Sequence, residues 1–218
     1  MNKKPRICAV GMFQKIYDIQ LQSLINVFSM KGIKSIQTTH YQNKILKFLD
    51  ISFFLFVNKN KYDVIHMQAH SHFNIISVIL AIFWAKILKK KIIVMYYGGA
   101  AKEFFSIAPK YFRVMFSQVN EIVVAGNYIQ TVFSDLKIST TIIPHVINVY
   151  KWPYRHRVLS ENHLLWVRHL TKEYNPLMLV KVFNKLNLKV PGMKLKIVGT
   201  GDLQNEMEKY ISTNSLNG

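Results

Sequence analysis

Short runs rich in isoleucine and valine alternate with helix-length segments over most of this 218-residue chain. The strand-like runs are Ile7–Gly11, Ile33–Thr38, Val64–Met67, Lys91–Met95, Glu121–Ala125, Thr140–Ile143, Leu164–Val167 and Lys194–Val198. Between them, helices are predicted over Ile16–Met30, Asn43–Val57, Phe73–Leu88, Glu103–Phe116 and Tyr128–Leu136. Continuous apolar strands that alternate with helices are typical of parallel sheets covered on both faces. The sequence therefore predicts an α/β fold with a doubly wound parallel sheet.

The alternation is interrupted over residues 144–160, where two prolines stand among several aromatic residues. Such a break is typical of a linker between domains. The sequence predicts a first Rossmann-like domain over residues 1–150, a linker over residues 151–160 and an incomplete second Rossmann-like unit over residues 161–218. Ligands of such sheets bind beyond the carboxyl ends of the strands, so the residues that follow each strand are the most informative about function.

Basic residues outnumber acidic ones, with 29 Lys and Arg against 11 Asp and Glu, which gives a net charge of +18. This charge favours anionic partners such as phosphates or an acidic membrane surface, although a general bias toward Lys, Asn and Ile explains part of it. We expect no nucleic-acid partner, because the basic residues are scattered and no nucleic-acid-binding motif is present.

The single cysteine, Cys8, lies in an apolar run and is expected to be buried, so no disulfide forms within the chain. The basic N-terminus is followed by too few apolar residues for a signal peptide. Phe73–Leu88 is too short to span a bilayer and contains Lys86, so we expect it to be a buried crossover helix. Together these features fit a cytoplasmic location.

Glycine and histidine residues follow the first and third predicted strands. After the first strand, Gly11 allows a tight turn into a helix whose N-terminus offers N–H groups to an anion; a plain turn is the alternative. His70 and His72 follow Val64–Met67, where we expect them to line a polar loop that faces a substrate. His66 lies inside that strand, and because no Cys, Asp or Glu stands beside these histidines, no metal site is predicted.

Tyr97, Gly98 and Gly99 follow the predicted strand Lys91–Met95. Two glycines at a strand end allow the backbone to approach a ligand or another chain segment closely. Glu103 falls in the first turn of the next helix, where its carboxylate complements the helix dipole; substrate binding is its alternative role.

Six segments resemble the GT-B glycosyltransferases of the family 4 type in their order and spacing. They are DVIHMQAHSH, YYGGAAKEFF, IVVAGNYIQTVF, TIIPHVINVYKWPYR, LLWVRHLTKEYNP and LKIVGTGDLQNEME, and together they extend over nearly the whole chain. The resemblance implies transfer of a sugar from a nucleotide diphosphate sugar, as co-substrate, to a glycan or lipid-linked acceptor in cell-surface polysaccharide synthesis. It also implies that no cofactor or obligatory metal is needed, that the acceptor binds the first domain and that the donor binds mostly the second.

The resemblance also assigns roles in the first domain. Tyr97 stands where the family often has a histidine before the double glycine, which makes Tyr97 and His70 the candidate catalytic residues. A tyrosine can hydrogen-bond a sugar hydroxyl, but it is a poor base at neutral pH because its ordinary pKa is about 10. The expected substrate-binding residues are Gly11, His70, His72, Tyr97, Gly98, Gly99 and Glu103.

In the second domain the family commonly holds the diphosphate with a Gly-Arg pair and a later lysine. The matching positions here are Arg168, His169 and Tyr174. An arginine can bind a phosphate with two parallel hydrogen bonds if it points toward the donor. The residues expected to bind the donor phosphate are Arg168, His169, Gly199 and Gly201.

The family's paired-glutamate motif, which holds the donor sugar, has no match within residues 1–218. The resemblance therefore implies that the second domain is truncated and that Trp166, Val180, Phe183 and Leu195 expose an apolar face. We expect this chain alone to transfer sugar poorly or not at all. The alternative is a non-catalytic remnant or acceptor-binding subunit that needs a second chain to complete the second domain.

Several basic residues fall near aromatic and aliphatic helices of the first domain. The resemblance and these residues predict peripheral binding to the anionic inner face of a membrane, with a merely solvated surface as the alternative. The set is Lys86, Lys89, Lys90, Lys91, Lys102, Lys110 and Arg113.

Overall fold

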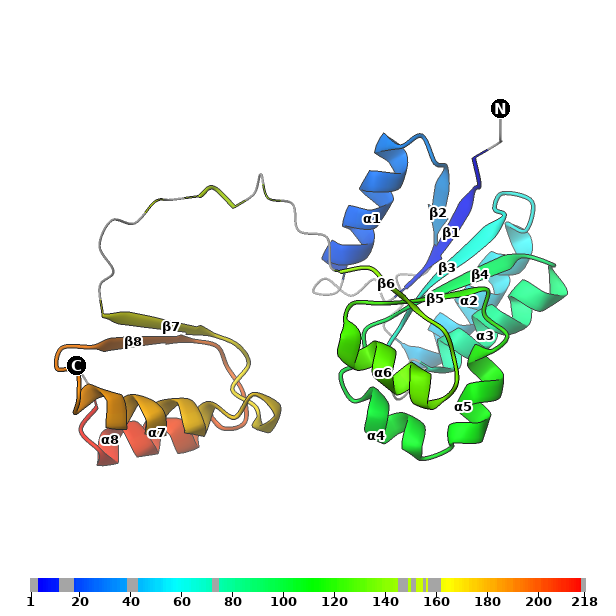
Figure 1. Cartoon of the computed structure of the whole chain (residues 1–218). Helices are drawn as coiled ribbons and strands as arrows, with labels where there is room; N and C mark the ends of the chain where they lie inside the picture. The colour runs from blue at the N-terminus through cyan, green and yellow to red at the C-terminus, as the bar shows by residue number, and fades with distance from the viewer. Residues whose placement is uncertain are drawn as a thin grey trace. The chain divides into compact units, whose positions relative to one another are not determined.

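The computed structural model describes residues 4–11, 18–38, 43–71, 75–144, 149, 152–154, 156 and 162–216. The chain divides into two compact units, Met1–Asn148 and Val149–Gly218. Figure 1 labels their helices and strands.

The first unit contains one sheet of six parallel strands in the order β2-β1-β3-β4-β5-β6. This is one of the two common doubly wound orders. All strands are parallel, and the side of the sheet on which successive strands are added changes between β1 and β3. The predicted α/β class is confirmed, and the predicted strands Ile7–Gly11, Val64–Met67 and Lys91–Met95 lie in the same sheet. The strands are β1 (Ile7–Val10), β2 (Ser35–Gln37), β3 (Val64–Ala69), β4 (Lys91–Tyr96), β5 (Glu121–Val124) and β6 (Thr141–Ile142).

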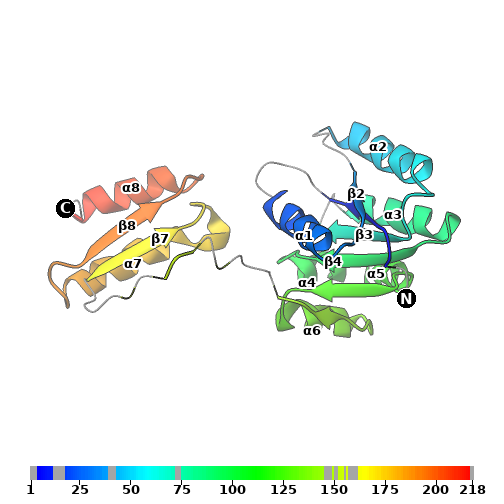
Figure 2. The ribbon, with the colours of Figure 1, turned by 90° about the horizontal axis from the view of Figure 1, so that it is seen from above.

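Helices cover both faces of this sheet, as Figures 1 and 2 show. On β4, Ile92, Val94 and Tyr96 join the main apolar core, which also holds side chains of α2, α3, α4, α5 and α6. The alternate residues of β4, Ile93 and Met95, lie on the opposite face, toward α1. The helices are α1 (Asp18–Met30), α2 (Lys44–Val57), α3 (Ile75–Ile87), α4 (Ala101–Ser106), α5 (Pro109–Phe116) and α6 (Asn127–Asp135).

Local sequence explains where two of these helices begin. The side chain of Asn43 caps α2 by accepting hydrogen bonds from the backbone N–H groups of Ile45 and Leu46, at 2.9 and 3.3 Å. The prediction of a single helix over Glu103–Phe116 is wrong. α4 ends at Ser106, and a separate helix, α5, begins at Pro109. Proline cannot donate the helical hydrogen bond and keeps Ala108 out of the helical conformation, with φ −150° and ψ 65°.

Two further expectations for the first unit are met. Cys8 is fully buried, and this burial raises the pKa of its thiol to about 12. α3 lies within the predicted crossover helix and places residues such as Val78 and Ala81 in the core. Among the helices of the described ranges, none has both the length and the apolar character that crossing a bilayer requires.

The second unit contains the parallel pair β7 (His163–Val167) and β8 (Lys194–Val198) with α7 (Pro176–Asn187) and α8 (Gln204–Thr213). A short 3₁₀ turn, η3 (Lys172–Tyr174), precedes α7. The apolar cluster of this unit consists of Leu170, Val180 and Met207 with partly buried neighbours. Figure 2 shows both helices beside the strand pair.

The prediction of which side chains form the exposed apolar face is wrong for Val180 and Phe183, and Trp166 is half-buried and packs against the apolar cluster. Val180 and Phe183 are buried, because α7 packs them against the strands and α8. Leu165, Val167 and Val198 are exposed apolar side chains of the strand pair, and they alternate with the half-buried residues Trp166 and Ile197. In this unit α7 and α8 therefore cover one face of the strand pair, and the other face carries these three side chains.

Candidate functional site

The carboxyl ends of the parallel strands bring the predicted first-domain residues to one edge of the sheet. Gly11 follows β1 and adjoins β3, at the reversal point where ligands of doubly wound sheets bind. A Cβ atom at Gly11 would lie 2.6 Å from Leu21 Cδ2 and 3.3 Å from Gln68 Oε1. Gly11 thus allows α1 to pack close to β3, which is a structural reason for the glycine that needs no ligand.

Gly98 and Gly99 have different surroundings. A Cβ atom at Gly98 would lie 2.5 Å from Ser71 Oγ and 2.7 Å from the Tyr96 hydroxyl. These two hydroxyl groups are buried and hydrogen-bonded to each other at 2.7 Å. A Cβ atom at Gly99 would have no neighbour within 4 Å. Gly98 therefore permits close packing of the chain, whereas the space beside Gly99 is free for a ligand.

The rings of His70 and Tyr97 stack at this edge. Their centroids are 5.6 Å apart and their planes are inclined by 26°. The Tyr97 hydroxyl donates a hydrogen bond to Met95 Sδ at 2.7 Å. Burial raises the pKa of Tyr97 to about 12. Tyr97 therefore stays protonated at neutral pH and is poorly suited to act as a base.

His70 has the properties of a neutral base. Burial lowers the pKa of His70, and the positive charge of Lys47 lowers it further. The imidazole is consequently neutral at pH 7 and can accept a proton from a hydroxyl group. Of the two candidate catalytic residues, His70 is the better suited to proton transfer.

The remaining predicted residues of the first unit lie apart from this pair or outside the described residues. Glu103 is exposed in the first turn of α4, as predicted from the sequence. His66 is buried within β3, and His72 lies outside the described residues. In the part of the chain that the structure describes, no group of three His, Cys, Asp or Glu residues is placed to hold a metal ion.

Gly199 and Gly201 lie in the segment between β8 and α8, beside the segment that follows β7. A Cβ atom at Gly199 would collide with the carbonyl oxygen of Arg168, and one at Gly201 would collide with that of Leu170. Leu170 also donates a backbone hydrogen bond to Thr200 at 3.0 Å. These glycines allow two backbone segments to lie close together, so packing accounts for them without a phosphate.

Arg168, which is expected to bind the donor phosphate, and Tyr174, which stands at the position of the family's lysine, are neighbours in the second unit. The guanidinium carbon of Arg168 lies 5.2 Å from the centre of the Tyr174 ring. A guanidinium group held beside an aromatic ring can still direct N–H groups to an anion. His169 is exposed next to Arg168. The arrangement suits phosphate binding better than the two glycines do.

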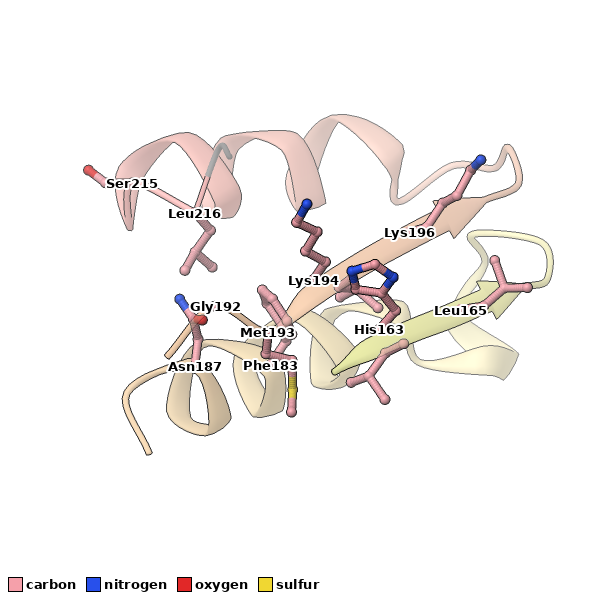
Figure 3. Close-up of a pocket in the computed structure, with 12 residues that line it drawn as sticks. His163, Leu165, Phe183, Asn187, Gly192, Met193, Lys194, Lys196, Ser215 and Leu216 are labelled. Atoms are coloured by element: carbon pink, nitrogen blue, oxygen red, sulfur yellow. The ribbon is translucent and has the colours of Figure 1, made fainter. Parts of the chain in front are cut away.

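An open hollow of about 780 Å³ lies elsewhere in the second unit, as Figure 3 shows. Its lining includes His163 and Lys194, the first residues of β7 and β8, together with Phe183. Arg168 follows the other end of β7 and does not line this hollow. The hollow is therefore separate from the predicted phosphate-binding residues.

Sequence reasoning missed three residues at the edge of the first sheet: Lys47, Gln68 and Ser71. Lys47 lies on α2. Its charge lowers the pKa of His70 only because the fold brings the two residues near each other. Gln68 and Ser71 are buried beside Gly11 and Gly98, respectively. The only sequence signal for Gln68 and Ser71 was that they lie close to His70 in the chain. No sequence signal pointed to Lys47.

No protein-family model matches the sequence, and no curated protein matches it. Several solved structures are similar in fold. A point mutant of S. aureus TarM, in complex with fondaparinux, alpha-GlcNAc-glycerol and UDP, has a TM-score of 0.53 and 13% identity, over 78% of this chain and 35% of TarM. The fold is of the GT-B type.

Two further structures support this assignment. MnaA of S. aureus, a co-structure with UDP, has a TM-score of 0.56 and 11% identity over 95% of this chain and 65% of MnaA. A putative UDP-N-acetylglucosamine 2-epimerase from Listeria monocytogenes has a TM-score of 0.56 and 10% identity over 99% of this chain and 67% of that one. The chain thus spans about a third of TarM and about two thirds of the other two. At such identities the likeness concerns the fold alone.

Proposed function

We propose that this chain takes part in transferring a sugar from a nucleotide diphosphate sugar to a glycan or lipid-linked acceptor in cell-surface polysaccharide synthesis. The observation that carries the proposal is the neutral His70 stacked on Tyr97 at the carboxyl edge of the first sheet, near the strand end that carries Gly99. UDP in the TarM and MnaA structures supports a nucleotide-sugar partner. Assignment to family 4 rests on the six sequence segments.

In this proposal the first unit binds the acceptor. Tyr97 provides an aromatic wall, and the open side of Gly99 leaves room for a sugar ring. His70 accepts a hydrogen bond from the acceptor hydroxyl and takes its proton as the glycosidic bond forms. Lys47 helps to keep His70 neutral, which is the state needed for this step.

The second unit binds the donor phosphates. Arg168, held against the Tyr174 ring, supplies N–H donors to the diphosphate, and His169 lies next to it. When the sugar leaves, negative charge grows on the terminal phosphate, and a fixed guanidinium stabilises that charge. No metal or cofactor has a role in this proposal.

We further propose that the first unit docks on an anionic membrane at the cytoplasmic face. Lys59 Nζ lies 4.9 Å from the centre of the Phe56 ring on α2, and Lys86 lines a groove between α3 and α5. Lys90, from the predicted basic set, donates a hydrogen bond to the Tyr62 carbonyl. Cations beside exposed apolar groups suit a surface with negative headgroups. The exposed apolar residues of α2 are Ile45, Leu46, Leu49, Phe53, Phe56 and Val57.

The sugar-transfer proposal is tested with the full chain and a panel of UDP-sugars and GDP-sugars. Saturation-transfer NMR detects donor binding, and release of nucleotide diphosphate detects turnover. We expect Arg168→Gln to weaken donor binding and His70→Ala to leave donor binding unchanged; the low turnover expected of this chain alone, where it is measurable, should fall further in His70→Ala. His163→Ala is the matched control, since His163 lies at the other end of β7.

The outcomes separate the proposed roles. Donor binding without turnover favours the acceptor-binding subunit that works with a second chain, and turnover favours the enzyme. Absence of binding by every nucleotide sugar would contradict the proposed function. An equal loss of turnover in His70→Ala and His163→Ala would contradict the role of His70.

A further inference from the structure

An open hollow of about 590 Å³ lies at the amino ends of the central strands of the first unit, and four lysines line it. Lys4 belongs to the segment before β1. Lys89, Lys90 and Lys91 belong to the turn after α3 and the start of β4. β1, β3 and β4 are adjacent parallel strands, so the ends of β1 and β4 lie roughly 10 Å apart on either side of β3. The fold therefore brings cations from two distant parts of the chain to one hollow.

Among the described residues that line this hollow, Asp63 is the only acidic one. Both of its carboxylate oxygens accept hydrogen bonds from the Arg6 side chain, Oδ2 from Nε at 3.0 Å and Oδ1 from Nη2 at 2.7 Å. These bonds hold the pKa of Asp63 well below its usual range, and the charge of Lys90 lowers it further. Because Arg6 already offsets this carboxylate, the four lysines give the hollow an excess of positive charge.

Two of these lysines have ammonium groups that no part of the fold uses. Within the described residues, the exposed side chains of Lys89 and Lys91 make no hydrogen bond or ion pair. Lys90 Nζ donates a hydrogen bond to the Tyr62 carbonyl at 2.9 Å, but a neutral carbonyl does not offset its charge. The C-terminus of α3 attracts cations and accounts for Lys89 or Lys90. It does not account for Lys4 and Lys91, which lie at strand ends.

The lining of the hollow favours phosphate groups over other anions and over nucleotides. Lysine binds phosphate as a point charge, and a terminal phosphate carries roughly two negative charges at neutral pH, more than a carboxylate. Among the described lining residues none is aromatic, so the hollow offers no ring on which a base could stack. At roughly 30 Å³ per water-sized group, the hollow holds about twenty such groups, several times the size of one phosphate.

We propose that this basic hollow binds a compound with two or more linked phosphate groups, either a soluble oligophosphate or the headgroup of a phospholipid. Lys89 and Lys91 hold the phosphates from the β4 side, and Lys4 holds them from the β1 side. The site goes beyond the proposed sugar transfer and does not depend on it. The length of β3 separates the hollow by roughly 20 Å from the carboxyl edge that carries His70.

The test is calorimetric titration of the full chain with inorganic triphosphate and with inorganic phosphate. We expect triphosphate to bind at least about tenfold more tightly, because it reaches lysines on both sides of the hollow, and to bind more weakly as salt is added. A wild-type protein that does not bind triphosphate in a saturable way, or that binds the two anions equally, would overturn the proposal.

Charge-matched variants locate the site. Lys89→Gln with Lys91→Gln removes no contact of the fold and is expected to lower triphosphate affinity roughly 3- to 30-fold, the range for two exposed ion pairs. Lys181→Gln with Lys185→Gln, on α7, removes the same charge from exposed positions and should leave affinity within about twofold, as should Arg168→Gln. A loss in either control as large as that in the first variant would overturn the proposal, because it would place the triphosphate elsewhere or reduce its binding to general charge.

Vesicle binding identifies the source of the phosphates. The probes are phosphatidylcholine vesicles with and without cardiolipin, a lipid whose headgroup joins a pair of phosphates. If Lys89→Gln with Lys91→Gln weakens binding to the cardiolipin vesicles and triphosphate competes with them, the ligand is a lipid headgroup. If the same variant loses triphosphate affinity but binds these vesicles as the wild type does, the ligand is a soluble oligophosphate.

Discussion

Gly98 and Gly99 are adjacent in the sequence, but only Gly98 is enclosed by side chains. Alanine at Gly98 would press on the Tyr96 ring, which is fully buried and cannot move away. We expect Gly98→Ala to lower the free energy of unfolding by about 1–3 kcal/mol, as overpacking does. Gly99→Ala should change it by less than about 0.5 kcal/mol. Chemical denaturation of both variants measures the difference, and equal stabilities would contradict the assigned packing.

The same contrast predicts an effect on function. Because the space beside Gly99 is open, a methyl group there does not disturb the fold but enters the proposed acceptor site. Gly99→Ala therefore tests ligand access without a change in stability, whereas Gly98→Ala tests packing. Two glycines that look alike in the sequence thus have separate roles.

His66 predicts an acid-sensitive stability. Its pKa is about 4 in the folded protein and about 6.5 when unfolded, so the unfolded chain binds more protons between these values. The stabilisation from keeping His66 neutral is complete above pH 6.5 and is lost as pH falls toward 4. From pH 7 to pH 4.5 this loss is about 2 kcal/mol.

We expect His66→Phe to lose about 2 kcal/mol less than the wild type between pH 7 and pH 4.5, because a phenyl ring does not titrate. Urea unfolding at both pH values measures this difference. His163→Phe, at an exposed position, is the control and should keep the acid sensitivity of the wild type. Equal slopes for wild type and His66→Phe would contradict the burial of a neutral imidazole.

At the level of single residues, the sequence singled out candidate site residues that directly follow a strand. The structure places His70 and Tyr97 side by side, because carboxyl ends of parallel strands meet at one edge, and their roles stay a prediction. Lys47 was missed because its influence on His70 depends on how α2 packs. Gly199 and Gly201 were assigned to phosphate binding, but their close approach to the segment after β7 depends on tertiary structure that a sequence motif does not reveal.

At the level of elements, α2 differs from an ordinary surface helix because six large apolar side chains lie on its exposed surface. We expect the double variant Leu49→Gln with Phe53→Gln to reduce binding to anionic vesicles at least about tenfold, since each side chain contributes roughly 1.5–3 kcal/mol when buried. The matched control is Met178→Gln with Val182→Gln, another exposed apolar pair one turn apart, on α7. Sedimentation with vesicles at low and high salt measures binding.

The vesicle experiment has two informative failures. Equal binding to neutral and anionic vesicles would contradict the contribution of the basic residues. An equal loss in the α2 and α7 variants would show that binding depends on general hydrophobicity rather than on α2. In either case the proposed docking through the first unit would be withdrawn.

The elements themselves were predicted well. All eight predicted strands form within two residues of the expected ends, because β-branched runs bounded by polar residues leave little choice. The predicted helix over Glu103–Phe116 failed because Pro109 was not weighed against the apolar pattern. For α2 the sequence did not reveal which face is buried, since apolar residues occur all around the helix.

At the level of the whole molecule, the two units differ in how much apolar surface they bury. The central strands β3 and β4 have α1 on one face and the main apolar core on the other. By contrast, Leu165 and Val167 on β7 are 68% and 60% exposed, and a two-stranded sheet has little stability of its own. Among the described residues of the second unit, the buried apolar cluster is formed by Leu170, Val180 and Met207.

This difference predicts two separate unfolding steps. In hydrogen exchange on the full chain, we expect β7 and β8 to exchange at least about 100-fold faster than β3 and β4, which corresponds to about 3 kcal/mol in opening free energy. Peptide-level mass spectrometry measures both regions in one sample, so solution conditions cancel. A mild denaturant should accelerate the second unit first. Equal protection of the two strand pairs would show that the second unit is stabilised by contacts beyond its own described core.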